Sequence, residues 1–196
     1  MKDSPDGRRF VKNPSLRVPR RLKIMPISYP KLVFAALFTL YFLSIVFKPL
    51  DGSFLDLVDL PIHETGHLLF RPFGEFMMVA GGSLFQIVVP AAFVGYFARR
   101  EKYYSASIVL FWVGQSMLNV FVYAGDAQAM RLVLTSGLTG SEGGFHDWNY
   151  LLTQTGFIKS TATVANLIRL LGTLTILAAG IGAVYYSIYP QDETDL

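Results

Sequence analysis

Two histidines and a glutamate lie close together in the chain, in the order His63-Glu64-Thr65-Gly66-His67. On a helix, residues four positions apart share one face, so both imidazoles can turn toward a single metal ion. Glu64 lies beside them, where its carboxylate can take a proton from a water that the metal polarises. The alternative is an amphipathic helix with surface histidines, because so short a pattern also arises by chance. The apolar sequence around it favours the metal site, since ionisable groups in such surroundings are costly and tend to be functional.

The residue types available in the chain indicate which metal to expect. There is no cysteine, so thiolate ligands and disulfides are both excluded. Histidine, aspartate and glutamate remain, a donor set that suits zinc (Zn2+) in a hydrolytic site. A catalytic zinc usually takes three protein ligands and keeps one position for water. We therefore expect Zn2+ as the cofactor, His63 and His67 as two of its ligands and Glu64 as the catalytic base, with a third ligand from elsewhere.

His146 is the first candidate for the third ligand. It is the only other histidine and lies in the polar cluster Phe145-His146-Asp147-Trp148-Asn149. Asp147 or Asn149 could orient its ring as a partner of a metal ligand. The alternative is a surface histidine that caps a helix beginning near Asp147.

Asp126 is the second candidate. It ends a segment in which polar side chains recur every three or four residues and so share one helical face, namely Trp112, Gln115, Asn119 and Tyr123. In the alternative interpretation, Gln115 and Asn119 are interhelical hydrogen-bonding groups and Asp126 marks the membrane boundary. Gly82 could allow close approach of an extended peptide, or of another helix. We expect Gly82, Gln115 and Asn119 to contact substrate.

The composition predicts a membrane protein. Hydrophobic residues make up 52% of the 196 residues and charged residues 16%, with a mean hydropathy of +0.41, too apolar for a usual soluble domain. Uncharged apolar segments cover 32–47, 76–98, 103–125 and 170–186, and each approaches or reaches the ~20 residues of a spanning helix. The stretches 51–75 and 126–161 are more polar. Pro61 suits the first turn of the histidine helix, and Asp59 can cap it.

The distribution of charge predicts the orientation. Nine of the 17 lysines and arginines lie within residues 1–31, and a basic stretch before an apolar span holds an N-terminus in the cytoplasm, against anionic lipid. This concentration disfavours nucleic-acid binding as the role of the chain. If the histidine helix enters the membrane only partly, Arg99, Arg100 and Lys102 also face the cytoplasm. Residues 51–75 and 126–161 then emerge together on the extracytoplasmic side, which also satisfies the need for a third ligand.

The expected architecture is therefore an all-α, polytopic transmembrane helical bundle with four full spans and a partly inserted helix that carries the two histidines. We expect a basic cytoplasmic arm (1–31), a single membrane-embedded metalloprotease-like domain (32–190) and a short tail (191–196). The location we expect is a bacterial inner (plasma) membrane.

The His-Glu-x-Gly-His form at 63–67, set in apolar sequence and followed by Gly81-Gly82 and further spans, resembles the site-2 protease family of intramembrane zinc metalloproteases. The resemblance covers roughly residues 55–130 and is specific at the pentapeptide. It implies that His63 and His67 bind zinc, that Glu64 is the general base, and that peptide bonds are hydrolysed in or near the bilayer. That family takes its third ligand from a Leu-Asp-Gly motif on a later span. Here Leu50-Asp51-Gly52 precedes the histidines, and the later aspartate is Asp126, in Gly125-Asp126-Ala127.

The function predicted from these residues is that of a multi-pass membrane zinc metalloprotease acting on membrane or membrane-proximal proteins. The alternative is a non-catalytic membrane protein, such as an assembly factor or partner subunit, with a structural or vestigial metal site. A metal or proton transporter ranks last, because the inner halves of the spans carry almost no ionisable groups.

Overall fold

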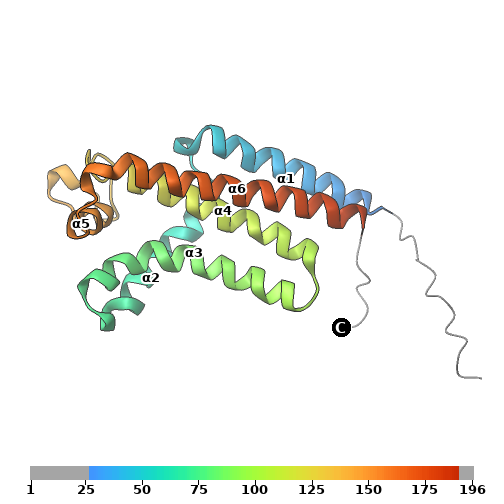
Figure 1. Ribbon diagram of the computed structural model, residues 1–196, viewed down its shortest axis with the longest axis horizontal. Helices are drawn as coiled ribbons and strands as arrows, with labels where there is room; N and C mark the ends of the chain where they lie inside the picture. The colour runs from blue at the N-terminus through green and yellow to red at the C-terminus, as the bar shows by residue number, and fades with distance from the viewer. Residues whose placement is uncertain (1–26, 190–196) are drawn as a thin grey trace, which may run out of the picture.

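The computed structural model describes residues 27–189, and over this range the regular structure is helical. Most of the predicted basic arm and the whole predicted tail lie outside the described residues. The helices are α1 (Tyr29–Phe47), α2 (Asp56–Phe70), α3 (Glu75–Arg99), α4 (Tyr103–Gly125), α5 (Asp147–Gln154) and α6 (Thr161–Ile188) (Figure 1). Four helices are long and apolar enough to span a membrane: α1, α3, α4 and the helical stretch Ile158–Ile188 that contains α6. The predicted all-helical bundle with four helices long and apolar enough to span a membrane is confirmed.

The hydrophobic core lies between α1, α4 and α6, which run side by side (Figure 1). Phe42 of α1 stacks on Phe111 of α4 with ring centroids 5.1 Å apart, and Ile176 of α6 is fully buried beside them. A Cβ on Gly114 of α4 would come within 2.6 Å of Ile176, so the missing side chain lets the two helices approach closely. This packing fixes α4 as a rigid support for the polar side chains on its other face.

α2 and α3 form an antiparallel pair next to α4, joined by a short turn at Arg71–Phe73 (Figure 1). The buried residues of α2 are Asp59, His63 and Gly66, which lie at helical spacing on one stripe. Gly66 and Gly81 let the two backbones meet, because a Cβ on Gly81 would lie 2.7 Å from the Gly66 carbonyl oxygen. The stripe that carries His63 therefore faces α3 and α4.

α2 begins one turn earlier than the sequence suggests, so the expected roles of Pro61 and Asp59 at its start are wrong. The turn is closed by Asp56, whose Oδ2 accepts a hydrogen bond from the Ser53 backbone N–H at 2.7 Å. Pro61 consequently lies inside the helix. Asp59 is only 1% exposed, and its Oδ1 accepts hydrogen bonds from Trp112 Nε1 at 2.7 Å and Ser116 Oγ at 3.3 Å. The carboxylate of Asp59 therefore packs against the polar face of α4 and does not cap α2.

α6 is longer than the apolar segment 170–186 and begins at Thr161. The predicted segment begins only at residue 170 because the charge of Arg169 interrupts the apolar run. Its guanidinium donates a hydrogen bond to the Val46 carbonyl at 3.2 Å and lies over the Phe121 ring, so the charge is accommodated at the end of α1 without breaking the helix.

The large apolar side chains that face outward lie along the predicted spans. Val33, Leu37 and Leu40 of α1 are 58–65% exposed. On α3 and α6 the exposed positions include Leu84, Val88, Phe93, Leu170, Leu174 and Ile181. Contiguous apolar surface on this scale mismatches water and matches the hydrocarbon of a bilayer.

The two ends of the bundle differ in chemistry. At one end the α3–α4 connection carries Arg99, Arg100 and Lys102, and the Tyr104 hydroxyl of α4 donates a hydrogen bond to the Lys31 carbonyl of α1. The start of α1 also meets the end of α6 there, through the Ser28 N–H and the Ser187 carbonyl. The opposite end holds α2, α5 and the loop from α4 to α5 (Figure 1). The polar stretches 51–75 and 126–161 thus meet in space, as expected.

Candidate metal centre

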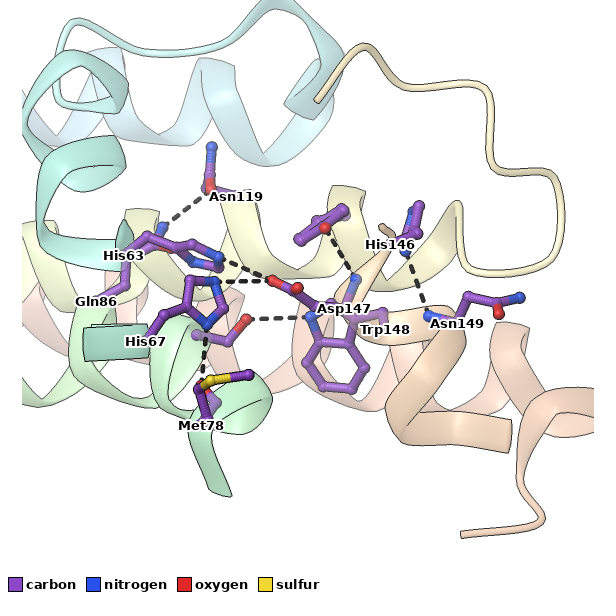
Figure 2. Close-up of polar contacts among 11 residues, drawn as sticks. His63, His67, Met78, Gln86, Asn119, His146, Asp147, Trp148 and Asn149 are labelled. Carbon is purple, nitrogen blue, oxygen red and sulfur yellow. Dashed lines mark hydrogen bonds and ion pairs between the residues drawn. The ribbon is translucent and has the colours of Figure 1, made fainter. Parts of the chain in front are cut away.

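His63 and His67 project from one face of α2 toward the same carboxylate (Figure 2). Nε2 of His63 lies 3.1 Å from Asp147 Oδ2, and Nε2 of His67 lies 3.2 Å from the same oxygen. One ligand atom from each of the three residues falls within 4.8 Å of the other two, and this is the group able to hold a metal ion among the described residues. The structure thus brings together two imidazoles and a carboxylate from helices far apart in the sequence.

The outer nitrogens of both rings are already committed. Nδ1 of His67 donates to the Met78 carbonyl at 2.9 Å, and Nδ1 of His63 lies 3.1 Å from the Gln86 side-chain oxygen (Figure 2). Both partners are oxygens that only accept, so each ring carries a proton on Nδ1. Once the proton shared with Asp147 is lost, the Nε2 atoms that face Asp147 are the ones with a lone pair to offer a metal. This arrangement of outer partners is the usual one for histidines that bind a metal.

Asp147 is held in place by the residues around the first turn of α5. Its backbone N–H donates to the Tyr123 hydroxyl at 3.1 Å, and the indole N–H of Trp148 donates to Ser83 Oγ at 3.1 Å (Figure 2). Asn149 donates from its side chain to the Ala127 carbonyl. α5 is therefore tied to both α3 and the end of α4, with the carboxylate of its first residue aimed at α2.

His146 and Asp126 are not in this group, so the structure differs from the expected third ligand. Nδ1 of His146 accepts a hydrogen bond from the Asn149 backbone N–H, which makes His146 the N-cap of α5. The capping role given above as the alternative is confirmed, but the surface position is wrong, because His146 is only 4% exposed. Its Nε2 lies 3.3 Å from Asp126 Oδ2, within ion-pair distance, but forms no hydrogen bond among the described residues. Asp126 also accepts from the backbone N–H groups of Arg131 and Leu132, which shapes the start of the following loop. Because the cap turns the ring of His146 back over its own helix, the next residue points at the histidines instead.

The residues expected to contact substrate have different positions in the structure. Gly82 lies next to the metal-facing nitrogens of the two imidazoles, where a Cβ would come within 2.6 Å of His63 Nε2 and 2.7 Å of His67 Nε2. Gln115 is 1% exposed and donates to Asp56 Oδ1 at 2.6 Å. Asn119 also donates to Asp56, and it lines the cavity beside the site. Gly82 thus gives room to the histidines, Gln115 supports α2, and Asn119 alone of the three borders the space where a substrate could lie.

The charges at the centre are strongly coupled. The hydrogen bond to Asp147 raises the pKa of His67 to about 9, against the effect of burial. Burial alone would raise the pKa of Asp147, but the hydrogen bonds and charges of His67 and His63 lower it. Without a metal the site thus holds a carboxylate and a shared proton. A metal ion that binds there takes the place of that proton.

Glu64 is exposed and borders a cavity of 580 Å³ that also contains the three candidate ligands. Much of the remaining wall is apolar and comes from α2, α3, α4 and the loop after α4; it includes Leu60, Val79, Val122, Leu132, Val133 and Phe145. A free carboxylate thus lies next to the candidate ligands, in a pocket large enough for a peptide side chain and its backbone.

Several site residues had no clear signal in the sequence. In the sequence, Asp147 stands out only as a possible partner of His146, and no pattern distinguishes Gln86. Met78 contributes its backbone carbonyl, which no side-chain pattern reveals. The best signal for Asp147 in the sequence is its position after His146. A histidine at an N-cap bonds its ring to the helix, so the acidic residue that follows can point toward another element.

Comparison with protein-family models, with curated proteins and with solved structures finds no match to this chain. The resemblance to the site-2 protease family therefore rests on the residues quoted for it.

Proposed function

We propose that this protein is a membrane-embedded zinc metallopeptidase that hydrolyses peptide bonds of membrane or membrane-proximal proteins. The observation that carries the proposal is the convergence of His63, His67 and Asp147 at the wall of a cavity that Glu64 also borders. Two imidazoles and one carboxylate are a ligand set found at catalytic zinc sites. A closed structural site usually takes four protein ligands, and three were found among the described residues. That count favours catalysis over a purely structural metal.

The residues of the site fit Zn2+ in three respects. Both Nε2 atoms face one carboxylate oxygen, both Nδ1 atoms are held by acceptor oxygens, and Gly82 leaves space where a larger residue would collide with the rings. When bound, zinc would supply a Lewis acid that polarises water and the scissile carbonyl.

Glu64 has the task of moving the proton. It follows His63 directly in α2, and its exposed side chain lines the cavity. We assign it the removal of a proton from water at the scissile bond and the return of that proton to the leaving amine. Apolar walls around the cavity would hold the peptide and keep bulk water away, which strengthens the electrostatic interactions within the site.

The proposed substrate and location follow from the surroundings of the site. The apolar lining of the cavity suits an extended segment rich in apolar residues. The outer face of α2 is also apolar, with Leu57 82% and Leu68 69% exposed, which supports partial insertion of α2 beside the lipid. The basic residues at the α3–α4 connection favour the cytoplasm for that end. The site would then open toward the extracytoplasmic side of a bacterial inner membrane.

The test is cleavage by the full-length protein in detergent micelles, supplied with zinc and with a library of apolar peptides of about 20 residues. Mass spectrometry would detect the products. Glu64→Gln should keep its zinc and lose at least 100-fold in cleavage rate, because general-base catalysis typically contributes 10²–10⁴-fold. Glu101→Gln, in the connection at the opposite end, is the control and should cleave normally. Undiminished cleavage by the Glu64 variant, or by protein stripped of metal, would overturn the proposal.

A further inference from the structure

A line of hydrogen bonds leads from His63 through two amide side chains to a carboxylate at the start of the same helix. His63 Nδ1 donates to Gln86 Oε1 at 3.1 Å, Gln86 Nε2 donates to Asn119 Oδ1 at 2.9 Å, and Asn119 Nδ2 donates to Asp56 Oδ1 at 3.2 Å. The middle of this line is visible in Figure 2, where Asn119 of α4 lies above Gln86 of α3. The line therefore passes from α2 to α3 to α4 and back to α2.

The direction of every bond in this line follows from its carboxylate end. An ionised carboxylate only accepts, so Asn119 must turn its NH₂ group toward Asp56 and its oxygen toward Gln86. Gln86 must then present its NH₂ group to Asn119 and its oxygen to His63. That oxygen requires a proton on Nδ1 of His63. If both amides were reversed, the Asn119 oxygen would face the carboxylate oxygen of Asp56, which is repulsive.

Asp56 is itself fixed as an acceptor by further donors. Gln115 Nε2 approaches Oδ1 at 2.6 Å, and the Ser53 backbone N–H approaches Oδ2 at 2.7 Å. Together with Asn119, three donors therefore point at one carboxylate, and each of them needs an acceptor there. Gln86 is 2% exposed. Water therefore cannot readily reach Gln86 and replace its hydrogen bond with His63.

We propose that Asp56 is a positioning residue for the metal centre: through Asn119 and Gln86 it places the ring proton of His63 on Nδ1 and so keeps Nε2 free to bind the metal. Asp56 is not itself a member of the three-residue ligand group. His67 needs no such relay, because its Nδ1 donates directly to a backbone carbonyl, which can only accept. The inference rests on the proposed metal site, and it does not depend on peptide hydrolysis.

The first test is the zinc affinity of the full-length protein in micelles, measured by competition with a chromophoric chelator. Asp56→Asn keeps the size of the side chain but can donate as well as accept, so the line loses its fixed direction. We expect zinc binding to weaken about 10- to 100-fold, the usual effect of losing an outer partner of a metal ligand. Asp51→Asn is the matched control. Asp51 is an exposed carboxylate in the same segment, outside the line, and this variant should bind zinc as the wild type does.

A second variant separates this role from mere support of the fold. In Asp56→Asn with Gln86→Glu, the new carboxylate at position 86 accepts directly from His63 and from a reversed Asn119, whose oxygen then accepts from the amide at position 56. If Gln115 also turns over, so that its oxygen accepts from the second N–H of that amide, every bond along the line is formed again and zinc affinity should recover most of the loss. Nitrogen-15 NMR of the zinc-loaded protein reads the same event, because the chain has only three histidines. The ring proton of His63 should lie on Nδ1 in the wild type and the double variant. In Asp56→Asn it should be divided between two populations, one with the proton on Nδ1 and one with the proton on Nε2.

Each outcome is decisive. Wild-type zinc affinity in Asp56→Asn, no recovery in the double variant, or a His63 proton on Nε2 in the wild type would overturn the role of Asp56. A wild-type protein that binds no zinc would overturn this inference together with the metal site. Zinc binding without any peptide cleavage would count against the proposed peptidase activity alone, since the relay is measured without substrate.

Discussion

Asp147 Oδ2 lies 3.1 Å from Nε2 of His63, although the two residues are 84 positions apart in the chain. This contact joins the middle of α2 to the first residue of α5, and the same oxygen also reaches His67 at 3.2 Å. The two spans α3 and α4 and a long loop lie between these residues in the chain and must fold correctly before the contact can form, so the centre depends on the whole end of the bundle.

The first prediction distinguishes Asp147 from Asp126 as the third metal ligand. Asp147→Asn should weaken zinc binding by at least about 100-fold, since the loss of a direct ligand exceeds the 10- to 100-fold effect typical of outer partners. Asp126→Asn removes the partner of His146 and should leave zinc affinity within about threefold of the wild type. Metal analysis of the purified proteins after dialysis checks both. Loss of zinc in Asp126→Asn, with retention in Asp147→Asn, would reverse the assignment.

The second prediction concerns the space that Gly82 leaves next to the Nε2 atoms of the two histidines. Gly82→Ala puts a methyl group within 2.6 Å of His63 Nε2 and 2.7 Å of His67 Nε2, so the rings must move and zinc affinity should fall at least tenfold. Gly95→Ala lies in the same helix with nothing within 4 Å and is the matched control. It should bind zinc normally and gain about 0.5–1 kcal/mol of stability from the better helix former. Equal zinc affinities in the two variants would contradict the steric argument.

The third prediction concerns how α5 is attached. The hydrogen bond from Trp148 Nε1 to Ser83 Oγ ties α5 to α3 next to Asp147. Trp148→Phe and Ser83→Ala each remove that bond, whose net value is about 0.5–1.5 kcal/mol, and each should weaken zinc binding by roughly 2- to 10-fold. The double variant should be no weaker than the worse single variant, because both remove the same bond. Chelator competition on all four proteins gives the coupling, and fully additive losses would argue against this bond as the attachment.

The fourth prediction is a dependence of stability on pH caused by Asp59. Burial raises the pKa of Asp59 from 3.8 to about 6, despite the hydrogen bonds from Trp112 and Ser116. The folded protein therefore binds this proton more tightly than the unfolded chain, and stability falls as pH rises from about 4 to 6. The full cost above that range is at most about 3 kcal/mol. Asp59→Asn should melt at a higher temperature than the wild type at pH 7.5.

At about pH 3 the advantage of the Asp59→Asn variant should disappear, because the wild-type carboxyl is then largely protonated in both the folded and the unfolded state. Thermal unfolding in micelles, followed by circular dichroism at the two pH values, checks the prediction. Asp51→Asn, which changes an exposed carboxylate, should melt like the wild type throughout. An Asp59→Asn variant that is destabilised at pH 7.5 would show that the charged form supports the fold.

The spans, the histidine pair and the polar face of α4 could all be predicted from the sequence, because each depends on local periodicity. Apolar runs of sufficient length become helices in a bilayer, because their backbone N–H and C=O groups find no water there and must hydrogen-bond to one another. Residues four apart on a helix share a face. The side chains of Trp112, Gln115, Asn119 and Tyr123 do form one face, and they contact Asp59, Asp56 and Asp147. The alternative of interhelical hydrogen bonding holds for Gln115 and Asn119.

The third donor was decided only by the tertiary structure. His146 and Asp147 are adjacent, and composition alone cannot say which of them points at α2. The answer comes from the N-cap of α5, which commits the His146 ring to Asn149, and from the anchors on Tyr123 and Ser83 that aim Asp147 inward. The earlier start of α2 and the continuation of α6 through Arg169 have the same origin. In each case a polar group takes a partner from a distant helix, and local propensity contains no information about that partner.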